Sequence, residues 1–200
     1  MKKCFSVLLF LVFLLLFFGS ASADDALVSY NWSDVVGVIQ EVFSDDSSYY
    51  LIEDVDAVIW VPSYFYSLDL TEEEIENDGI ASFVNSSGDA LVYLSYSDMD
   101  GISFDSLFNY YSRNNYNVKK VLVNDIPAIL MRDEANNILS LSYQTQAGKL
   151  FQIMFYPILD ENYAALYQLV ISSIRPYSPL FEESSEPVVS TNPVSGLISK

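Results

Sequence analysis

The sequence contains no histidine and only one cysteine, and these shortages limit its chemistry more than any motif does. Without histidine the chain cannot form a Ser-His-Asp triad, and it lacks the side chain used most often as a general acid or base. Cys4 lies in the first few residues, so the rest of the chain offers no disulfide and no thiol nucleophile. Zinc in its usual Cys and His sites is excluded for the same reason. We therefore expect no catalytic residue, no metal site and no cofactor.

Basic residues are also scarce. Nine Lys and Arg stand against 27 Asp and Glu, which gives a net charge of −18. Nucleic acids and anionic membranes both bind through a positive footprint, and a field of this sign repels them. We expect no nucleic-acid partner, and we interpret the acidity mainly as a source of solubility.

The chain opens with a segment typical of secretory signal peptides. Lys2 and Lys3 precede residues 5–18, which are apolar except for one serine, and the small residues of Ser20-Ala21-Ser22-Ala23 follow. The apolar run is shorter than the ~20 residues that span a bilayer, which favours a cleaved signal over an anchor helix. Cleavage after Ala23 would remove the cysteine and both lysines and deepen the net charge to −20. We expect a secreted, extracellular protein that is not inserted in a membrane.

Helix-like and strand-like segments follow in a mixed order. Apolar residues at helical spacing predict helices at 32–43, 104–111 and 160–174, the first two capped by Asn31 and Ser103. Thr71 and Glu74 form a capping box for a short acidic helix. Runs of β-branched and aromatic residues predict strands at 49–53, 57–61, 80–85, 90–97, 117–123, 126–132, 138–145 and 150–156.

This order predicts an α+β fold in which an antiparallel sheet is flanked by amphipathic helices. Asn124-Asp125 is expected to form a two-residue hairpin turn, since both residue types tolerate positive φ. The strand at 90–97 is apolar on both faces, which predicts a central strand covered on both sides. We expect one domain at 24–175 and a disordered tail rich in Pro, Ser and Glu at 176–200.

The order of elements and several short phrases resemble the PsbP-like α/β/α sandwich, as found in small secreted proteins of Gram-positive bacteria. The phrases are Trp60-Val61-Pro62, Asp78-Gly79, Asp98-Met99-Asp100-Gly101-Ile102-Ser103, Val123-Asn124-Asp125-Ile126-Pro127 and Ser172-Ser173-Ile174. The resemblance covers roughly residues 31–175. It implies a protein that acts as an adaptor or assembly factor, and it assigns no functional residue, because fold alone is weak evidence of function.

Aromatic residues are the most suggestive feature, with 15 Tyr, 13 Phe and 2 Trp. Tyr64, Phe65 and Tyr66 cluster after Pro62 in a segment expected to be a loop, where exposed rings would offer rigid contact area to a partner. Trp60 is expected to lie in the core. We take Tyr64, Phe65 and Tyr66 as the candidate partner-binding residues.

Simpler explanations account better than calcium binding, glycoside hydrolysis or a Ser-Lys dyad for the remaining polar residues. The phrase Asp98-x-Asp100-Gly101 suggests calcium, but an EF-hand loop needs a further acid or amide and a Glu that are missing, so a turn is favoured. The densest acids are expected to form a solvated face rather than a glycosidase pair; they are Glu53, Asp54, Asp56, Glu72, Glu73, Glu74, Glu76 and Asp78. A Ser-Lys dyad would need a desolvated lysine, whereas Lys119, Lys120 and Lys149 are expected to be solvated.

The sequence therefore predicts a secreted acidic binding or assembly module that acts through contacts with an unknown protein or surface partner, without catalysis. A carboxylate-dependent extracellular hydrolase and a calcium-responsive surface protein stay open as alternatives.

Overall fold

The computed structural model describes residues 27–43, 47–55, 57–99, 101–145 and 148–176. The expected signal peptide at 1–23 and all but the first residue of the expected tail at 176–200 lie outside these residues. The helices are α2 (Trp32–Phe43), α3 (Glu72–Glu76), α4 (Phe104–Arg113) and α5 (Glu161–Ser173), with a short 3-10 turn at Glu53–Val55. The strands are β1 (Val28–Tyr30), β2 (Ser47–Ile52), β3 (Ala57–Pro62), β4 (Phe65–Leu68), β5 (Gly79–Asn85), β6 (Leu91–Ser97), β7 (Asn117–Val123), β8 (Ile126–Asp133), β9 (Ile138–Gln144), β10 (Leu150–Tyr156) and β11 (Arg175–Pro176).

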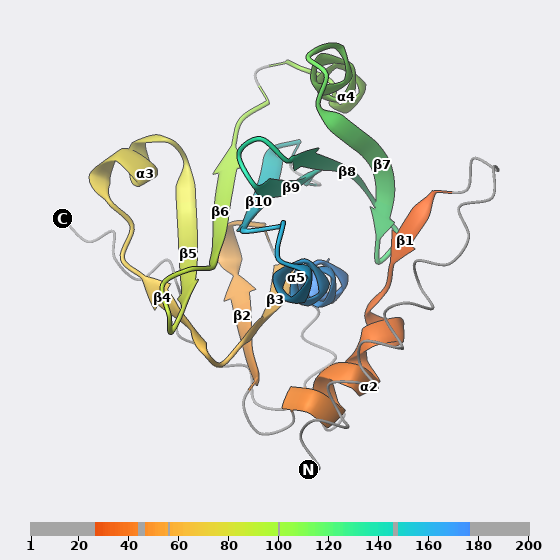
Figure 1. Cartoon of the computed structure of the whole chain (residues 1–200). Helices are drawn as coiled ribbons and strands as arrows, with labels where there is room; N and C mark the ends of the chain where they lie inside the picture. Colours follow the sequence, from red (N-terminus) through yellow and green to blue (C-terminus); the bar gives the residue numbers. More distant parts are fainter. Residues whose placement is uncertain (1–26, 44–46, 56, 100, 146–147, 177–200) are drawn as a thin grey trace.

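Eight strands form one large sheet in the order β1-β7-β8-β9-β10-β6-β5-β4. All neighbours are antiparallel except β1 and β7, which run parallel. The sheet curves around α5, and α4 lies outside it (Figure 1). The expected α+β class with an antiparallel sheet and flanking helices is confirmed.

A second, smaller sheet of β11, β3 and β2 closes the other side of the core. The backbone N–H of Trp60 in β3 donates to Ser173 Oγ at the end of α5, with a separation of 2.9 Å. Tyr50 of β2 also reaches the large sheet, since its ring centroid lies 4.6 Å from that of Phe83. Helix α5 is therefore enclosed between the two sheets and α2 (Figure 1), which explains why it buries residues on every side rather than along one stripe.

Helix caps and turns follow the sequence, except at the start of α2. The Asn31 side chain, expected to cap α2, instead donates from Nδ2 to Asp34 Oδ2 at 3.0 Å. The Ser103 and Asp160 side chains accept hydrogen bonds from the backbone N–H groups of Ser106 and Asn162, so α4 and α5 begin where a cap is available. Thr71 and Glu74 form the expected capping box. Asn124 and Asp125 have φ values of 46° and 67°, as the tight hairpin between β7 and β8 demands.

Three strands were not expected: β1, β4 and β11. Strand β4 occupies the segment that was expected to be an aromatic loop, and it forms the end of the large sheet. Strand β6 lies inside the sheet as expected, but only one of its faces is fully covered. Val92 and Leu94 are buried against the core, whereas Leu91 and Tyr93 on the outer face are half-buried. Trp60 is fully buried, which confirms its expected place in the core.

Candidate functional site

The three aromatic residues expected to bind a partner do not point in the same direction. Phe65 faces the core and is 2% exposed, so its ring is not available to a partner. Tyr66 points to the opposite face of β4, because successive side chains of a strand alternate, and it is 49% exposed. The three residues thus do not share one surface.

Tyr64 lies in the turn before β4, next to the core residue Phe65. The centroids of the two rings are 5.3 Å apart. Partial burial raises the pKa of the Tyr64 hydroxyl. Of the three predicted residues, only Tyr66 belongs to the outer face of the large sheet.

Tyr66 begins a row of apolar side chains that crosses four strands of that outer face. The register pairs Tyr66 with Val84, Val84 with Leu91, and Leu91 with Tyr156. Directly opposite residues on neighbouring strands have adjacent side chains, so the four form one continuous strip. Both ends of the strip are open, since Tyr66 and Tyr156 are exposed, while Val84 and Leu91 are half-buried between them.

A second row runs beside the first and completes the surface. Leu68 is paired with Ser82, Ser82 with Tyr93, and Tyr93 with Met154. Leu68 is exposed, and Tyr93 and Met154 are half-buried. We call the outer-face residues Tyr66, Leu68, Val84, Leu91, Tyr93, Met154 and Tyr156 the outer patch. The sequence signal for the outer patch is the apolar second face of β6, which predicts a covered surface and is half-exposed in the structure.

Helices α3 and α4 lie at the margins of the outer patch. The Tyr93 hydroxyl donates to the carbonyl oxygen of Glu74 in α3, with a separation of 3.4 Å. Gly79 makes this approach possible, because a Cβ at that position would lie 2.6 Å from the Glu74 carbonyl oxygen. On the α4 side, Gln152 bridges the hydroxyl groups of Tyr111 and Ser142. The patch is therefore bordered by one strongly acidic helix and one tyrosine-rich helix.

A hydrogen-bonded network joins the β5–β6 hairpin to α5. Asn85 Nδ2 donates to Asp89 Oδ1 at 2.6 Å and to the Tyr163 hydroxyl at 2.7 Å, and the same hydroxyl donates to Asp89 Oδ1 at 2.8 Å. Asn85 Oδ1 accepts from the backbone N–H groups of Asp89 and Ala90. The pKa of Asp89 is lowered by these side-chain hydrogen bonds, and the pKa of Tyr163 is raised to about 12 by desolvation and by its bond to Asp89.

Replacing Asp89 with asparagine is expected to destabilise the protein more at pH 6 than at pH 3. Because the pKa of Asp89 is lower in the folded state, its carboxylate contributes stability above the unfolded-state pKa, and this contribution is lost as the pH falls through the folded-state value. Urea unfolding at the two pH values measures the difference. Asp69→Asn, at an exposed position before α3, corrects for the loss of one charge. An equal corrected effect at both pH values would contradict the assignment.

The acidic residues do not gather into a recognisable ion site in the described part of the chain. No group of three or more Cys, His, Asp or Glu is placed there to hold a metal ion. Asp98 pairs with Lys149, with 3.4 Å between Oδ1 and Nζ, while Asp100, Asp56 and the side chain of Asp54 lie outside the described residues. The calcium and hydrolase alternatives stay predictions.

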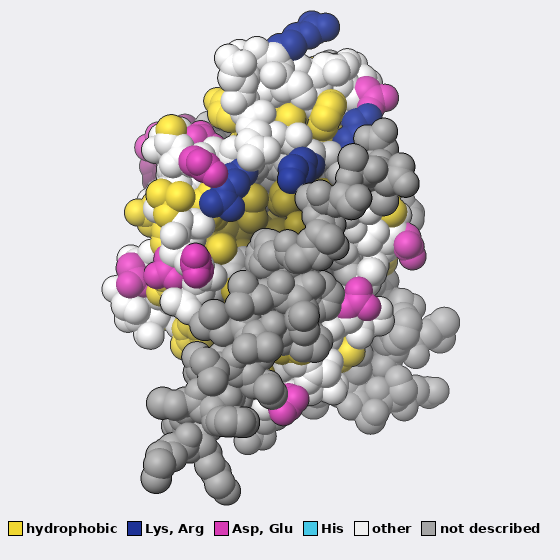
Figure 2. All heavy atoms as spheres, turned by 45° about the vertical axis from the view of Figure 1, so that its right-hand side comes forward, with side chains coloured by type: hydrophobic (Ala, Val, Ile, Leu, Met, Phe, Trp, Pro, Cys, Tyr) yellow, Lys and Arg dark blue, Asp and Glu magenta, His cyan; other side chains and the backbone are white. Residues whose placement is uncertain are grey.

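Lys119 and Lys120, neighbours in β7, point to opposite faces of the large sheet. Lys120 lies on the outer face and pairs with Asp105 of α4 at 2.8 Å. Lys119 lies on the inner face, opposite Leu130 in the register. Figure 2 shows Lys and Arg side chains gathered beside a hollow with a hydrophobic floor. Both lysines are exposed, as expected, but their surroundings differ.

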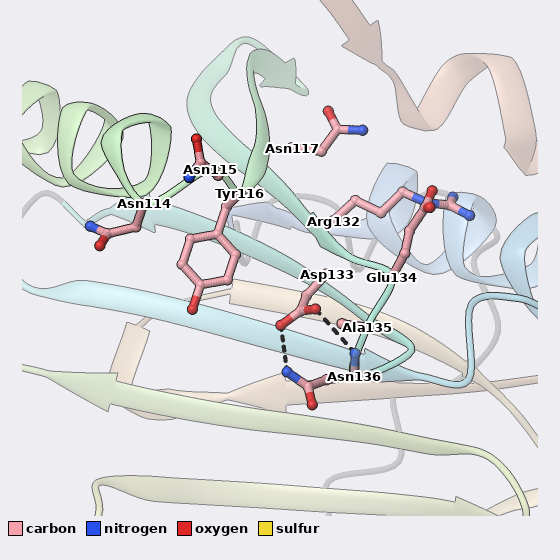
Figure 3. Close-up of a pocket in the computed structure, with 9 residues that line it drawn as sticks. All are labelled: Asn114, Asn115, Tyr116, Asn117, Arg132, Asp133, Glu134, Ala135 and Asn136. Atoms are coloured by element: carbon pink, nitrogen blue, oxygen red, sulfur yellow. Dashed lines mark hydrogen bonds and ion pairs between the residues drawn. The ribbon is translucent and has the colours of Figure 1, made fainter.

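A polar pocket of about 480 Å³ lies between the α4–β7 connection and the β8–β9 turn (Figure 3). Asn114 to Asn117 line one side of it and Arg132 to Asn136 the other. Asn136 donates from Nδ2 to Asp133 Oδ2 at 2.7 Å and from its backbone N–H to Asp133 Oδ1 at 3.1 Å. These two hydrogen bonds lower the pKa of Asp133. Arg132 Nε lies 3.0 Å from Glu134 Oε1. The charged groups on the β8–β9 side of the pocket are thus engaged with one another or with Asn136.

Comparisons with solved structures identify the fold. The chain is similar to the solution structure of cyanobacterial PsbP (CyanoP) from Synechocystis sp. PCC 6803, with a TM-score of 0.51 and 13% identity over 66% of this chain and 93% of that chain. A protein from Bacteroides thetaiotaomicron VPI-5482 also matches, with a TM-score of 0.42 and 12% identity over 67% of this chain and 49% of that one. No protein-family profile and no curated protein matches the sequence. The chain has a PsbP-like fold, as its sequence phrases predicted.

None of the helices in the described ranges has the length and hydrophobicity that a membrane crossing requires.

Proposed function

We propose that this chain, with its PsbP-like fold, is a secreted acidic binding module that docks a partner protein on the outer patch. The observation that carries the proposal is the cross-strand row from Tyr66 to Tyr156, which is apolar along its whole length and exposed at both ends. Large contiguous apolar patches are rare on proteins that act alone, and those rimmed by polar residues mark interaction sites. Tyrosines at such a site add rigid contact area with little loss of side-chain entropy.

The edge position of β4 offers a second kind of contact. Ser86 N donates to Tyr64 O, so the alternation of an antiparallel pair directs the backbone groups of Tyr66 and Leu68 toward β5. Those of Phe65 and Ser67 then point away from β5, at the end of the large sheet. An extended segment of the partner could pair with them while its side chains contact the outer patch.

The negative charge beside the outer patch favours a basic partner. The rim beside the patch carries Glu72, Glu73, Glu74 and Glu76 of α3, and the whole chain has a net charge of −18. A second copy of this chain would bring like charges together, whereas a partner with apolar residues flanked by Lys or Arg would be attracted. We therefore propose a basic partner protein, whose association is faster and tighter at low salt.

Binding also suits the residue types better than catalysis does. The chain has no histidine, and its one cysteine is at position 4. The outer patch itself holds only aromatic, aliphatic and thioether side chains, and none of its seven residues is a carboxylate, a lysine or an arginine.

Photo-crosslinking tests the proposal. A benzoylphenylalanine at position 66 is expected to crosslink to one protein of the native extracellular fraction, because this side chain would lie inside the interface. The control places the same group at Tyr110, which is exposed on α4 and outside the patch. Crosslinking of the same protein with equal yield from both positions would contradict docking at the outer patch.

A further inference from the structure

A second pocket, of about 210 Å³, lies on the inner face of the large sheet, where α5 leaves the β7–β8 end uncovered. Its apolar wall and floor are formed by Leu130, Leu139, Ile158 and Ile171. Ile158 and Ile171 are fully buried, and the two leucines are half-buried. This pocket is an extension of the core that remains open to solvent.

The pocket is built by regular elements and one turn residue. Ala164, Gln168 and Ile171 line it from α5, at the spacing of one helix face. Asn137, which has a positive φ of 61°, accepts at Oδ1 from the backbone N–H groups of Ile158 and Leu159, each at 2.8 Å. Its carboxamide thereby holds the wall that Ile158 provides, so the cavity is preformed.

Polar groups converge on the mouth of the pocket, and two of them are cationic. Lys119 and Arg132 both line it, together with Asn117 and Gln168. Within the described part of the chain, the ammonium group of Lys119 forms no hydrogen bond or ion pair. Arg132 is paired with Glu134 through Nε. Two of only nine basic residues in the whole chain therefore border one small apolar cavity.

We infer that this pocket binds a small amphipathic carboxylate, with its apolar chain against Leu130 and Ile171 and its carboxylate at Lys119. The volume is below the ~300–1,000 Å³ typical of drug-sized ligands, which suits a chain of medium length. The ammonium group of Lys119 supplies the charge-assisted bond that fixes the carboxylate. Arg132 and Asn117 also line the polar pocket of Figure 3, so the head group would lie on the side of the apolar pocket that faces this polar one.

An anion is favoured over a cation or a neutral ligand for a specific reason. An acidic protein repels anions at long range, so an anion site requires local cations, and both cations here lie at the mouth rather than in the apolar floor. The outer patch is on the opposite face of the sheet and shares no residue with this pocket. The inference is thus independent of the proposed protein-binding function.

Isothermal titration of the purified protein with octanoate tests the inference. Lys119→Met retains the stem of the side chain and removes its charge, and it is expected to weaken octanoate binding about tenfold, as loss of a charge-assisted hydrogen bond does. Lys120→Met is the matched control, since it makes the same change one residue away on the opposite face of β7. It is expected to change the affinity less than about twofold.

Two ligand controls separate charge from hydrophobicity. Octan-1-ol and octylammonium are expected to bind at least about tenfold more weakly than octanoate, because neither offers an anion to Lys119. Absence of octanoate binding, equal effects of the two lysine variants, or equal affinity for octanol would each overturn the inference.

Discussion

Replacing Asn124 with alanine is expected to lower the free energy of unfolding by about 3–5 kcal/mol. Its Oδ1 accepts from the backbone N–H of Trp32 at 2.6 Å, and its Nδ2 donates to the carbonyl oxygens of Ser172 and Ile174 at 2.9 and 2.6 Å. One side chain in the β7–β8 turn thus joins the start of α2 to the end of α5. Alanine would leave three partly buried backbone groups without this partner. It would also have to adopt the positive φ of 46° at a steric cost of about 1 kcal/mol.

Two further variants at this turn separate the causes. Asn124→Gly removes the hydrogen bonds but tolerates the backbone angle, so it is expected to be about 1 kcal/mol less destabilising than alanine. Asp125→Gly is the control, since Asp125 is exposed and has a similar φ of 67°. Urea unfolding followed by circular dichroism gives the three values. If Asn124→Gly were as stable as Asp125→Gly, the hydrogen bonds of Asn124 would not be what joins α2 to α5.

Replacing Trp60 with alanine is expected to cost about 3–5 kcal/mol. Its ring is fully buried between the small sheet and α2, with its centroid 5.1 Å from that of Phe43 in an edge-to-face arrangement. Alanine would leave a large cavity at the junction of β3, α2 and α5, and the backbone N–H bond to Ser173 would not compensate for it. Circular dichroism again measures unfolding, since the variant loses one of the two tryptophans.

Trp60→Phe distinguishes packing from polarity at the same position. The Trp60 Nε1–H is buried and has no hydrogen-bond partner among the described residues. A buried unpaired donor costs about 1–3 kcal/mol, so phenylalanine removes a penalty while it loses part of the apolar contact. We expect Trp60→Phe to cost less than half as much as Trp60→Ala. A phenylalanine variant as unstable as the alanine variant would show that the indole shape, rather than its apolar area, is required.

Local sequence signals predicted the elements that depend on local physics. The cap at Ser103, the capping box of Thr71 and Glu74, and the Asn124-Asp125 turn all formed where the sequence indicated. Each depends on a side chain that reaches a backbone group only a few residues away, or on the φ preference of one residue. The antiparallel hairpin of β7 and β8 followed from the Asn124-Asp125 turn and from the apolar runs on both sides of it.

Elements that depend on distant partners were not predicted. Strands β1 and β11 have three and two residues, and each exists because a distant strand, β7 or β3, supplies its hydrogen bonds. The sequence predicts a loop where β4 lies, because Pro62 ends the preceding strand, and β4 itself has only four residues. Its pairing with β5 places Phe65 in the core and Tyr66 on the outer face, and no local sequence signal predicts this difference in burial.

The same limit applies to the two surfaces on which the proposals depend. The outer patch combines residues from β4, β5, β6 and β10, so it becomes visible only when the strand order is known. The apolar pocket depends on which of two adjacent lysines faces inward. Strand alternation implied that Lys119 and Lys120 separate, but only the register with β8 shows that Lys119 lies beside Leu130.

The most direct test of the central claim measures how tightly the partner identified by crosslinking, purified on its own, binds variants of the outer patch. We predict that a Tyr66→Ser, Leu68→Ser double variant, which removes the two large exposed side chains that β4 contributes to the patch, weakens binding at least about tenfold, because a few large aromatic and aliphatic side chains carry most of the binding energy of an interface. Tyr110→Ser, the same truncation of an exposed tyrosine outside the patch, is predicted to alter it less than about twofold. Unchanged affinity of the double variant would contradict the assignment of the outer patch as the binding surface.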